Sequence, residues 1–393
     1  MQPFEFTTAA RIVFGRGRFT EIGRLAAELG RKALIVSNAD RSGERGLLSA
    51  LCDHAAAESV GTETLWLQGE PEIADVDRGI EAARSAGCDL VIGIGGGSAI
   101  DAAKAVAGLL TNGGNCLDYM EVIGDGQPIR VTPAPWIAVP TTAGTGAEVT
   151  RNAVIGSKEQ RYKASIRSPL LLPRVALVDP ELGLGVSREV TARAGMDALT
   201  QCIESYTSKG ANPVTDALAL EGIACCRRSL RRVCANGEDL DAREEMALAA
   251  LISGITLTNA GLGAVHGLAA PLGARHPVPH GSACAVLLPH VMEANIAALR
   301  AENPDQPAMQ RYVRLGRVLL GGLEGPGEDA ADVGVAVARS LVTDLGIPGL
   351  GRFGVTDEAI PDIVSMACKA SSMNFNPVRH TPQRLEQILR AGL

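Results

Sequence analysis

The chain has 393 residues, of which 46% are hydrophobic and 21% charged, and its formal net charge is -7. This length and apolar content are sufficient for two or three globular domains with large buried cores. The net negative charge provides no field that would attract nucleic acid or an anionic membrane surface, so we expect neither as a partner.

The cellular compartment is suggested by the N-terminus and by the cysteines. Residues 1–15 lack a charged segment followed by an apolar one, and we find no apolar run long enough to span a bilayer. The nine cysteines form no CxxC pair and are interpreted as small buried hydrophobic side chains, which suits a reducing compartment. We therefore expect a cytoplasmic protein.

In chain order, the first half alternates short β-rich runs with helical patterns. Each run has four to eight mainly apolar residues bounded by glycine, proline or polar turns. The predicted strands are RIVFG (11–15), KALIVS (32–37), ETLWLQG (63–69), DLVIGIGG (89–96), WIAVP (136–140) and VALVD (175–179). This alternation favours a doubly wound α/β domain over residues 1–187.

The second half reads as helices packed on helices. Apolar residues recur at intervals of three and four in 197–208, 213–233, 243–260 and 331–346. Residues 188–393 are therefore expected to form an all-helical domain, with a loop at 322–329.

A glycine-rich turn follows the fourth predicted strand. Gly95, Gly96, Gly97 and Ser98 precede a helix from about Ala99, with Ser98 and Asp101 spaced as a capping box. Glycines let backbone amides approach a pyrophosphate at a helix N-terminus, although a tight turn explains the same pattern equally well.

A second loop follows the fifth predicted strand. Residues 141–146, TTAGTG, combine hydroxyls and glycines at a strand's carboxyl end, where open α/β sheets bind ligands. Two such loops together favour a phosphate site over turn geometry alone. At the end of the second strand, Ser37 and Asn38 precede Asp40 and Arg41, which leaves NAD and NADP both open.

Two histidines suggest a metal site. His266 lies in a predicted buried helix, and Pro277 and Pro279 break the chain before a new helix from His280 to about Leu288. Imidazoles on consecutive buried helices can converge on one transition-metal ion.

Two further ligands are suggested by an earlier helix. Asp197 and Gln201 are four residues apart and share a helical face, although they could equally be a helix-start pair. With His266 and His280 they would give one divalent ion four ligands and leave room for a substrate oxygen.

Five motifs now stand in order: GGGSAID at 95–101, PTTAGTGAEVT at 140–150, DPEL at 179–182, GMDALT at 195–200, and VHGLAAPLG with a following HG within 265–281. Together they resemble the iron-containing (group III) alcohol dehydrogenase family over essentially the whole chain. The resemblance implies a dehydroquinate synthase-like architecture: a nucleotide-binding α/β domain, an all-helical domain, a metal in the cleft between them, and a homodimer or higher oligomer.

The resemblance also implies roles for particular residues. Asp197, His266 and His280 would hold the metal, Fe or Zn. The residues expected to line NAD or NADP are Gly95, Gly96, Gly97, Ser98, Thr141, Thr142, Thr145, Lys163 and Leu182, to which we add Asn38 and Asp101.

Two positions depart from the family pattern. Gln201 and Ala270 stand where the family usually has histidine. Glutamine is a poorer donor to Zn or Fe, so we expect weaker metal binding. Ala270 cannot relay a proton, and His276 is the nearest candidate for that catalytic role, with a solvated loop position as its alternative.

The expected function is interconversion of a small alcohol and its aldehyde or ketone by an NAD(P)-dependent oxidoreductase, with the metal polarising the substrate oxygen. One alternative is a metal-independent reductase of an oxo acid, similar to maleylacetate reductase, in which Arg151 or Arg275 holds a carboxylate. Another is a nucleotide-binding family member that has lost catalysis.

Overall fold

The structure is a computed structural model that describes residues 3–38, 44–160, 162–322 and 330–393. Two compact units make up this part of the chain. The sheet unit comprises Thr7–Thr142 and Gly146–Gly185, and the helical unit comprises residues 3–6, Ala143–Thr145 and Val186–Leu393. The predicted loop at 322–329 and the predicted positions of Asp40 and Arg41 fall almost entirely outside the described residues.

The sheet unit contains a six-stranded parallel sheet in the order β1-β8-β5-β4-β2-β3. The bounds are β1 Ile12–Phe14, β2 Lys32–Asn38, β3 Gly61–Leu67, β4 Leu90–Gly95, β5 Trp136–Pro140 and β8 Val175–Val178. Each of the six predicted strands is present, which confirms the doubly wound α/β class.

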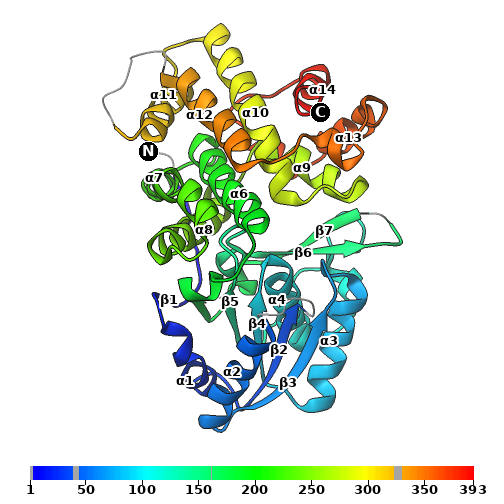
Figure 1. Cartoon of the computed structure of the whole chain (residues 1–393). Coiled ribbons are helices and arrows are strands. Elements are labelled where there is room, and N and C mark those ends of the chain that lie inside the picture. The colour runs from blue at the N-terminus through cyan, green and yellow to red at the C-terminus, as the bar shows by residue number, and fades with distance from the viewer. Residues whose placement is uncertain (1–2, 39–43, 161, 323–329) are drawn as a thin grey trace. The chain divides into compact units, whose positions relative to one another are not determined.

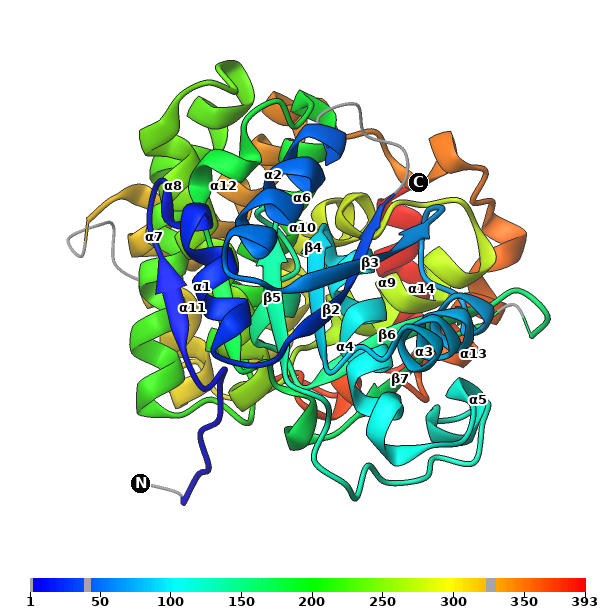
Figure 2. The same ribbon diagram turned by 90° about the horizontal axis from the view of Figure 1, so that it is seen from below.

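Alternating side chains on each strand divide the apolar core of this unit in two. On β2, Leu34 and Val36 pack with α3 (Ile73–Ala86) and α4 (Gly97–Asn112), whereas Ile35 packs with α1 (Ile22–Ala27) and α2 (Glu44–Ala57). The two-residue period of a strand therefore places helices on both faces of the sheet. Figure 2 shows the strands side by side with α4 packed against them.

The order of strands also locates the expected ligand crevice. From β2 the chain moves to β3 on one side, and the next strand, β4, lies on the other side of β2. Open α/β sheets bind ligands at such a switch point, outside the carboxyl ends of the strands. Asn38 ends β2 and Gly95 ends β4, so both predicted cofactor residues lie at this point.

An antiparallel hairpin was not predicted from the sequence. β6 (Asn152–Ser157) and β7 (Tyr162–Arg167) pair with each other, and their alternate residues Ala153, Ile155, Ala164 and Ile166 are buried on the α3–α4 face. On β7 the alternation of apolar and polar residues is the pattern of a half-buried strand, whereas on β6 the exposed Val154 stands between two buried apolar residues and obscures it. A short helix, α5 (Cys116–Tyr119), precedes β5.

The predicted capping box at Ser98 and Asp101 is wrong. Helix α4 has Gly96 as its N-cap and begins at Gly97, so Ser98 already lies inside the first turn. The carboxylate of Asp101 instead accepts hydrogen bonds from Lys104 Nζ (3.4 Å) and the backbone N–H of Val154 (3.1 Å). Asp101 therefore joins α4 to β6, and the first-turn amides have no side-chain cap.

The helical unit confirms the predicted all-helical second half, since its described residues contain helices and no strands. The α-helices are α6 Arg188–Thr207, α7 Pro213–Ala235, α8 Leu240–Ala260, α9 Ala264–Arg275, α10 His280–Glu302, α11 Pro307–Leu320, α12 Ala330–Leu345, α13 Ile360–Ala367 and α14 Pro382–Ala391. One large core of buried apolar side chains runs through this unit. Figure 1 shows its helices packed against one another.

Two predictions about α10 need correction. The helix does not end near Leu288 but continues through Pro289 to Glu302, so His290 lies inside it. Its length and hydropathy would also suit a membrane span, contrary to the sequence expectation, but 78% of the apolar window is buried inside the protein. The tandem α8 and α9 passes the same test only as a pair bent by 104°. Such burial is typical of a core helix.

Candidate active site

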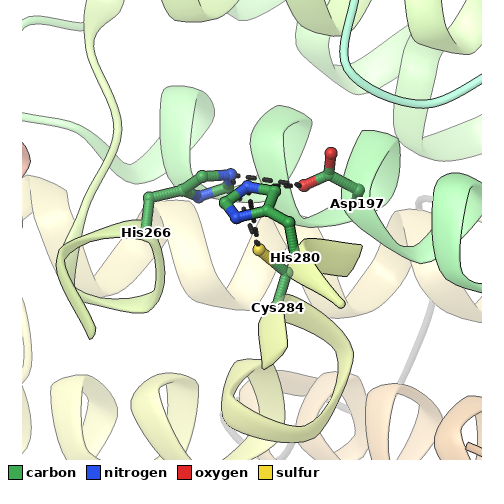
Figure 3. A group of neighbouring side chains, drawn as sticks. All are labelled: Asp197, His266, His280 and Cys284. Atoms are coloured by element: carbon green, nitrogen blue, oxygen red, sulfur yellow. Dashed lines mark hydrogen bonds and ion pairs between the residues drawn. The ribbon is translucent and has the colours of Figure 1, made fainter. Parts of the chain in front are cut away.

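Four metal-ligating side chains from three helices meet in the helical unit. They are Asp197 on α6, His266 on α9, and His280 and Cys284 on α10. One donor atom from each lies within 4.8 Å of the others. Figure 3 shows both imidazole rings directed toward the carboxylate of Asp197, with the sulfur of Cys284 close beside the rings. The predicted ligands Asp197, His266 and His280 are therefore brought together by the fold.

Close packing of α10 against α6 makes this meeting possible. Gly281 follows His280, and a Cβ atom at Gly281 would lie 2.2 Å from the backbone oxygen of Arg193 on α6. Only glycine fits at such an approach of two backbones. Pro279 is the N-cap of α10, so the helix starts at His280 and places this residue in the first turn.

The carboxylate of Asp197 faces both imidazoles. Its Oδ1 atom lies 3.3 Å from Nε2 of His266 and 3.7 Å from Nε2 of His280. Oδ1 is buried and accepts no hydrogen bond from the described residues. A buried carboxylate oxygen without a hydrogen-bond donor is costly, and a cation bound beside it would compensate this cost.

Glu204, one helical turn beyond Gln201 on α6, orients His266. Its Oε2 lies 2.6 Å from Nδ1 of His266, and its Oε1 accepts a hydrogen bond from the N–H of Val265 at 2.7 Å. Since Nδ1 is engaged by Glu204, Nε2 is the ring nitrogen that faces Asp197 and that would bind a metal. Glu204 was not predicted from the sequence, although its spacing of seven residues from Asp197 places both on one helical face.

Gln201 contacts the cluster through Asp197. Its Nε2 donates a hydrogen bond to Oδ2 of Asp197 at 3.1 Å, and its Oε1 accepts one from Oγ of Ser253 on α8 at 2.7 Å. Both ends of the amide are thus engaged within the protein. Gln201 lies where a ligand was predicted, but its oxygen is directed to Ser253.

The electrostatics of the cluster favour a cation. Charge on Cys284 is the main cause that raises the pKa of His280 to about 9, against the opposing effect of burial. Burial would lower the pKa of His266, but Cys284, Asp197 and Glu204 together raise it well above its ordinary value. Burial would raise the pKa of Asp197, yet the charges on His280 and His266 leave it lowered. The negative groups here therefore attract positive charge.

The donor set fits a divalent transition metal. It combines imidazole nitrogen, carboxylate oxygen and sulfur, which are the ligands that zinc and related ions take in proteins. The unpartnered Oδ1 of Asp197 provides an independent reason to expect an ion there.

His276 and Ala270 lie outside this cluster. His276 is the C-cap of α9, and it is not among the residues whose donor atoms converge. Ala270 is exposed on the same helix. The predicted role of His276 in proton transfer therefore has no support from a contact with the cluster, and it stays a prediction.

In the sheet unit, five predicted cofactor residues adjoin one another at the switch point. Gly95 has a φ of +143°, and a Cβ atom there would lie 3.0 Å from Oδ1 of Asn38. Thr141 donates its backbone N–H to the oxygen of Gly95 at 2.9 Å, while its buried Oγ1 has no hydrogen-bond partner in the described chain. A Cβ atom at Gly96 would be in ordinary van der Waals contact with the side chain of Thr142.

The other predicted cofactor residues have separate positions. Gly97 and Ser98 are the first two residues of α4. Lys163 on β7 forms an ion pair with Glu70, and Leu182, in a 3-10 turn (Pro180–Gly183), packs against the α1–α2 face of the core. Thr145 belongs to the helical unit.

Comparison with known proteins decides the family. The family description "Iron-containing alcohol dehydrogenase" matches residues 9–180, and "Fe-containing alcohol dehydrogenase family, C-terminal" matches residues 191–393. The chain belongs to the iron-containing alcohol dehydrogenase family. Membership confirms the predicted class, an oxidoreductase that interconverts alcohols and aldehydes. The family uses NAD(H) and a metal.

Individual relatives match over nearly their full lengths. The 1,3-propanediol dehydrogenase of Klebsiella pneumoniae is 36% identical, with 96% of this chain and 95% of the relative covered. The NAD-dependent methanol dehydrogenase of Bacillus methanolicus is 33% identical, with 97% of each covered. A crystal structure of 1,3-propanediol oxidoreductase has a TM-score of 0.90 and 34% identity, and the match covers 100% of both chains.

Proposed function

We propose that this family member interconverts short primary alcohols or diols and their aldehydes, with a divalent metal held by Asp197, His266 and His280. The observation that carries the proposal is the convergence of these donors around a buried carboxylate oxygen that lacks a hydrogen-bond donor. The names of the relatives, which act on 1,3-propanediol and methanol, support a small substrate.

The helical unit's part in the proposed reaction is to hold and orient the ligands. A bound divalent metal would supply a Lewis acid for the substrate oxygen. Glu204 binds Nδ1 of His266 and so directs Nε2 inward as the nitrogen that would bind the metal, and Gln201 fixes the carboxylate of Asp197. These hydrogen bonds pre-organise the donors, so that little rearrangement accompanies substrate binding.

The sheet unit's part is to bind the cofactor, which accepts or donates the hydride. We propose that backbone amides at Gly96, Gly97 and Ser98 bind the pyrophosphate, because the first turn of α4 has no side-chain cap. The unpartnered hydroxyl of Thr141 would add a hydrogen bond. Asn38 would face the adenosine ribose, and since its amide is neutral it would tolerate the 2'-phosphate of NADP.

The hydroxyl proton of an alcohol substrate must leave the site, and Ala270 has no group that could accept it. His276 is the proposed proton acceptor. Its imidazole is partly exposed, and it is the C-cap residue of α9, the helix that carries His266. A cytoplasmic location, which was expected from the N-terminal sequence and the cysteines, and a homodimer or higher homo-oligomer, which the family resemblance implies, remain predictions.

The function is tested with the purified full-length protein, NADH or NADPH, and a panel of short aldehydes that includes formaldehyde, acetaldehyde and 3-hydroxypropanal. We expect aldehyde-dependent oxidation of the cofactor, measured by its absorbance, with at least one aldehyde. Maleylacetate is included as a comparison substrate. Turnover of maleylacetate alone, or of no substrate with either cofactor, would overturn the proposal.

A further inference from the structure

Cys284 is the member of the metal-ligand cluster for which the sequence pattern provides no role. It lies one helical turn after His280 on α10, so the two side chains share a face of the helix. Its side chain is fully buried. The Sγ atom lies 3.6 Å from Nε2 of His280 and 3.7 Å from Nε2 of His266 (Figure 3).

These separations are those expected around one tetrahedral ion. Zinc bonds of ~2.0–2.3 Å to nitrogen, oxygen and sulfur, at tetrahedral angles, place neighbouring donor atoms roughly 3.3–3.6 Å apart. Four of the six separations between donor atoms in the cluster are 3.3, 3.6, 3.7 and 3.7 Å, and all six are within 4.8 Å. An ion at the centre would therefore require only small movements of the side chains.

Gln201 is the competing candidate for the fourth ligand, and its hydrogen bonds argue against it. Its oxygen accepts a hydrogen bond from Ser253, which a metal bond would have to replace. Exchanging the amide oxygen and nitrogen would set the oxygen 3.1 Å from Oδ2 of Asp197, and two acceptors would then face each other. The present orientation instead supports Asp197.

We propose that the thiolate of Cys284 completes the metal site with Asp197, His266 and His280, and that Gln201 is a positioning residue for Asp197. The inference rests on the proposed metal-dependent function. When a metal binds, Sγ of Cys284 and Nε2 of each histidine form a bond to the metal in place of the protons that these three groups share, and those protons are released to solvent.

This ligand set has a consequence for the metal. One carboxylate and one thiolate neutralise the charge of a divalent ion, whereas a set with Gln201 in place of Cys284 leaves one positive charge. Thiolate is a soft ligand, and soft ligands favour zinc over iron(II). The chain is therefore expected to retain zinc in preference to iron, despite the name of its family.

Cobalt(II) provides a direct probe, because a cobalt–thiolate bond gives an intense near-ultraviolet charge-transfer absorption. Full-length protein is stripped with a chelator and titrated with cobalt(II). We expect one ion per chain and the thiolate absorption in the wild type. In Cys284→Ser the absorption is lost and cobalt binds about tenfold or more weakly. In the control Cys368→Ser, which changes an exposed cysteine, both stay unchanged.

The possible failures are distinguishable. If one cobalt binds per chain without the thiolate absorption, or if the absorption persists in Cys284→Ser, Cys284 is not a ligand, while the proposed metal-dependent function stands. If the wild type binds no cobalt and no zinc, both proposals fall. X-ray absorption at the zinc edge of the wild type keeps the test independent of any variant: one sulfur neighbour supports the proposal, and nitrogen and oxygen neighbours alone overturn it.

Discussion

The Nδ1 atom of His266 lies 2.6 Å from the carboxylate of Glu204, and this contact fixes which nitrogen of the ring faces the metal ligands. Replacing Glu204 with Gln removes the charge while keeping the shape. We expect Glu204→Gln to weaken zinc binding roughly 10- to 100-fold, measured by competition with a chromophoric chelator. Glu293→Gln, which breaks an exposed ion pair with Arg339, should leave zinc affinity unchanged. If both variants bind zinc with the same affinity, Glu204 does not orient His266 for metal binding.

Gly96 tests whether a ligand approaches the turn after β4. Its φ is -74°, and a Cβ atom there would come no closer than 3.5 Å to another group, so the fold should tolerate alanine. A bound pyrophosphate would be obstructed. We expect Gly96→Ala to raise the KM for the cofactor about tenfold, or ~1.4 kcal/mol, with an unchanged Tm. Gly46→Ala, at an open position on α2, is the control; an unchanged KM in Gly96→Ala would contradict the assigned cofactor site.

Asn38 tests the choice between NAD and NADP. A carboxylate at this strand end would bind the ribose 2'-hydroxyl and repel a 2'-phosphate. We expect Asn38→Asp to shift the ratio of kcat/KM toward NAD by about tenfold or more. The matched variant Asn303→Asp adds the same charge at an exposed helix end. If the ratio of kcat/KM for NAD to that for NADP is the same in the wild type and in both variants, Asn38 does not face the ribose.

His380 should make the protein sensitive to acid. Burial, with a contribution from the nearby charge of Arg384, lowers its pKa to about 4, and its Nε2 lies 2.7 Å from Oδ1 of Asn295. The ordinary value of 6.5 applies in the unfolded chain, so between pH 6.5 and 4 the unfolded state binds more protons. Stability from this residue is therefore complete above pH 6.5 and is lost as the pH falls toward 4.

The corresponding measurement is urea unfolding at pH 7.5 and pH 5. When the pH falls from 7.5 to 5, we expect the free energy of unfolding of His380→Gln to decrease by ~1–2 kcal/mol less than that of the wild type. The reason is that the variant has no buried imidazole whose protonation favours the unfolded state. The other ionisable groups are common to both proteins and cancel in the difference. The same loss in both proteins would contradict the account of His380.

The sequence was informative where local pattern determines structure. The six parallel strands and the helical second half follow from apolar periodicity, and the convergence of Asp197, His266 and His280 agrees with their spacing and with the motifs quoted. The hairpin β6–β7 was missed although β7 alternates apolar and polar residues, because each strand has only six residues and Val154 breaks the alternation on β6. The extent of α10 was missed because Pro289 normally ends a helix, and here packing in the core outweighs the hydrogen bond that proline removes.

Two features of the metal site needed the three-dimensional structure. Gln201 was predicted as a ligand from its position on the face of Asp197, but its amide oxygen is bonded to Ser253, 52 residues later in the chain, on a different helix. Cys284 was grouped with the other cysteines as a small core residue. Its spacing of four from His280 was the available signal, and only the packing of α6, α9 and α10 shows that both side chains face Asp197.

Metal dependence of turnover tests the central claim most directly. The wild type and Asp197→Asn are stripped with a chelator, reconstituted with increasing zinc or iron(II), and assayed for alcohol-dependent reduction of the preferred cofactor alongside elemental analysis. We predict that wild-type activity falls at least ~100-fold on stripping and returns in proportion to bound metal, to a full value at one ion per chain, while Asp197→Asn stays inactive and binds metal poorly. Full turnover in metal-free wild-type protein would contradict the account.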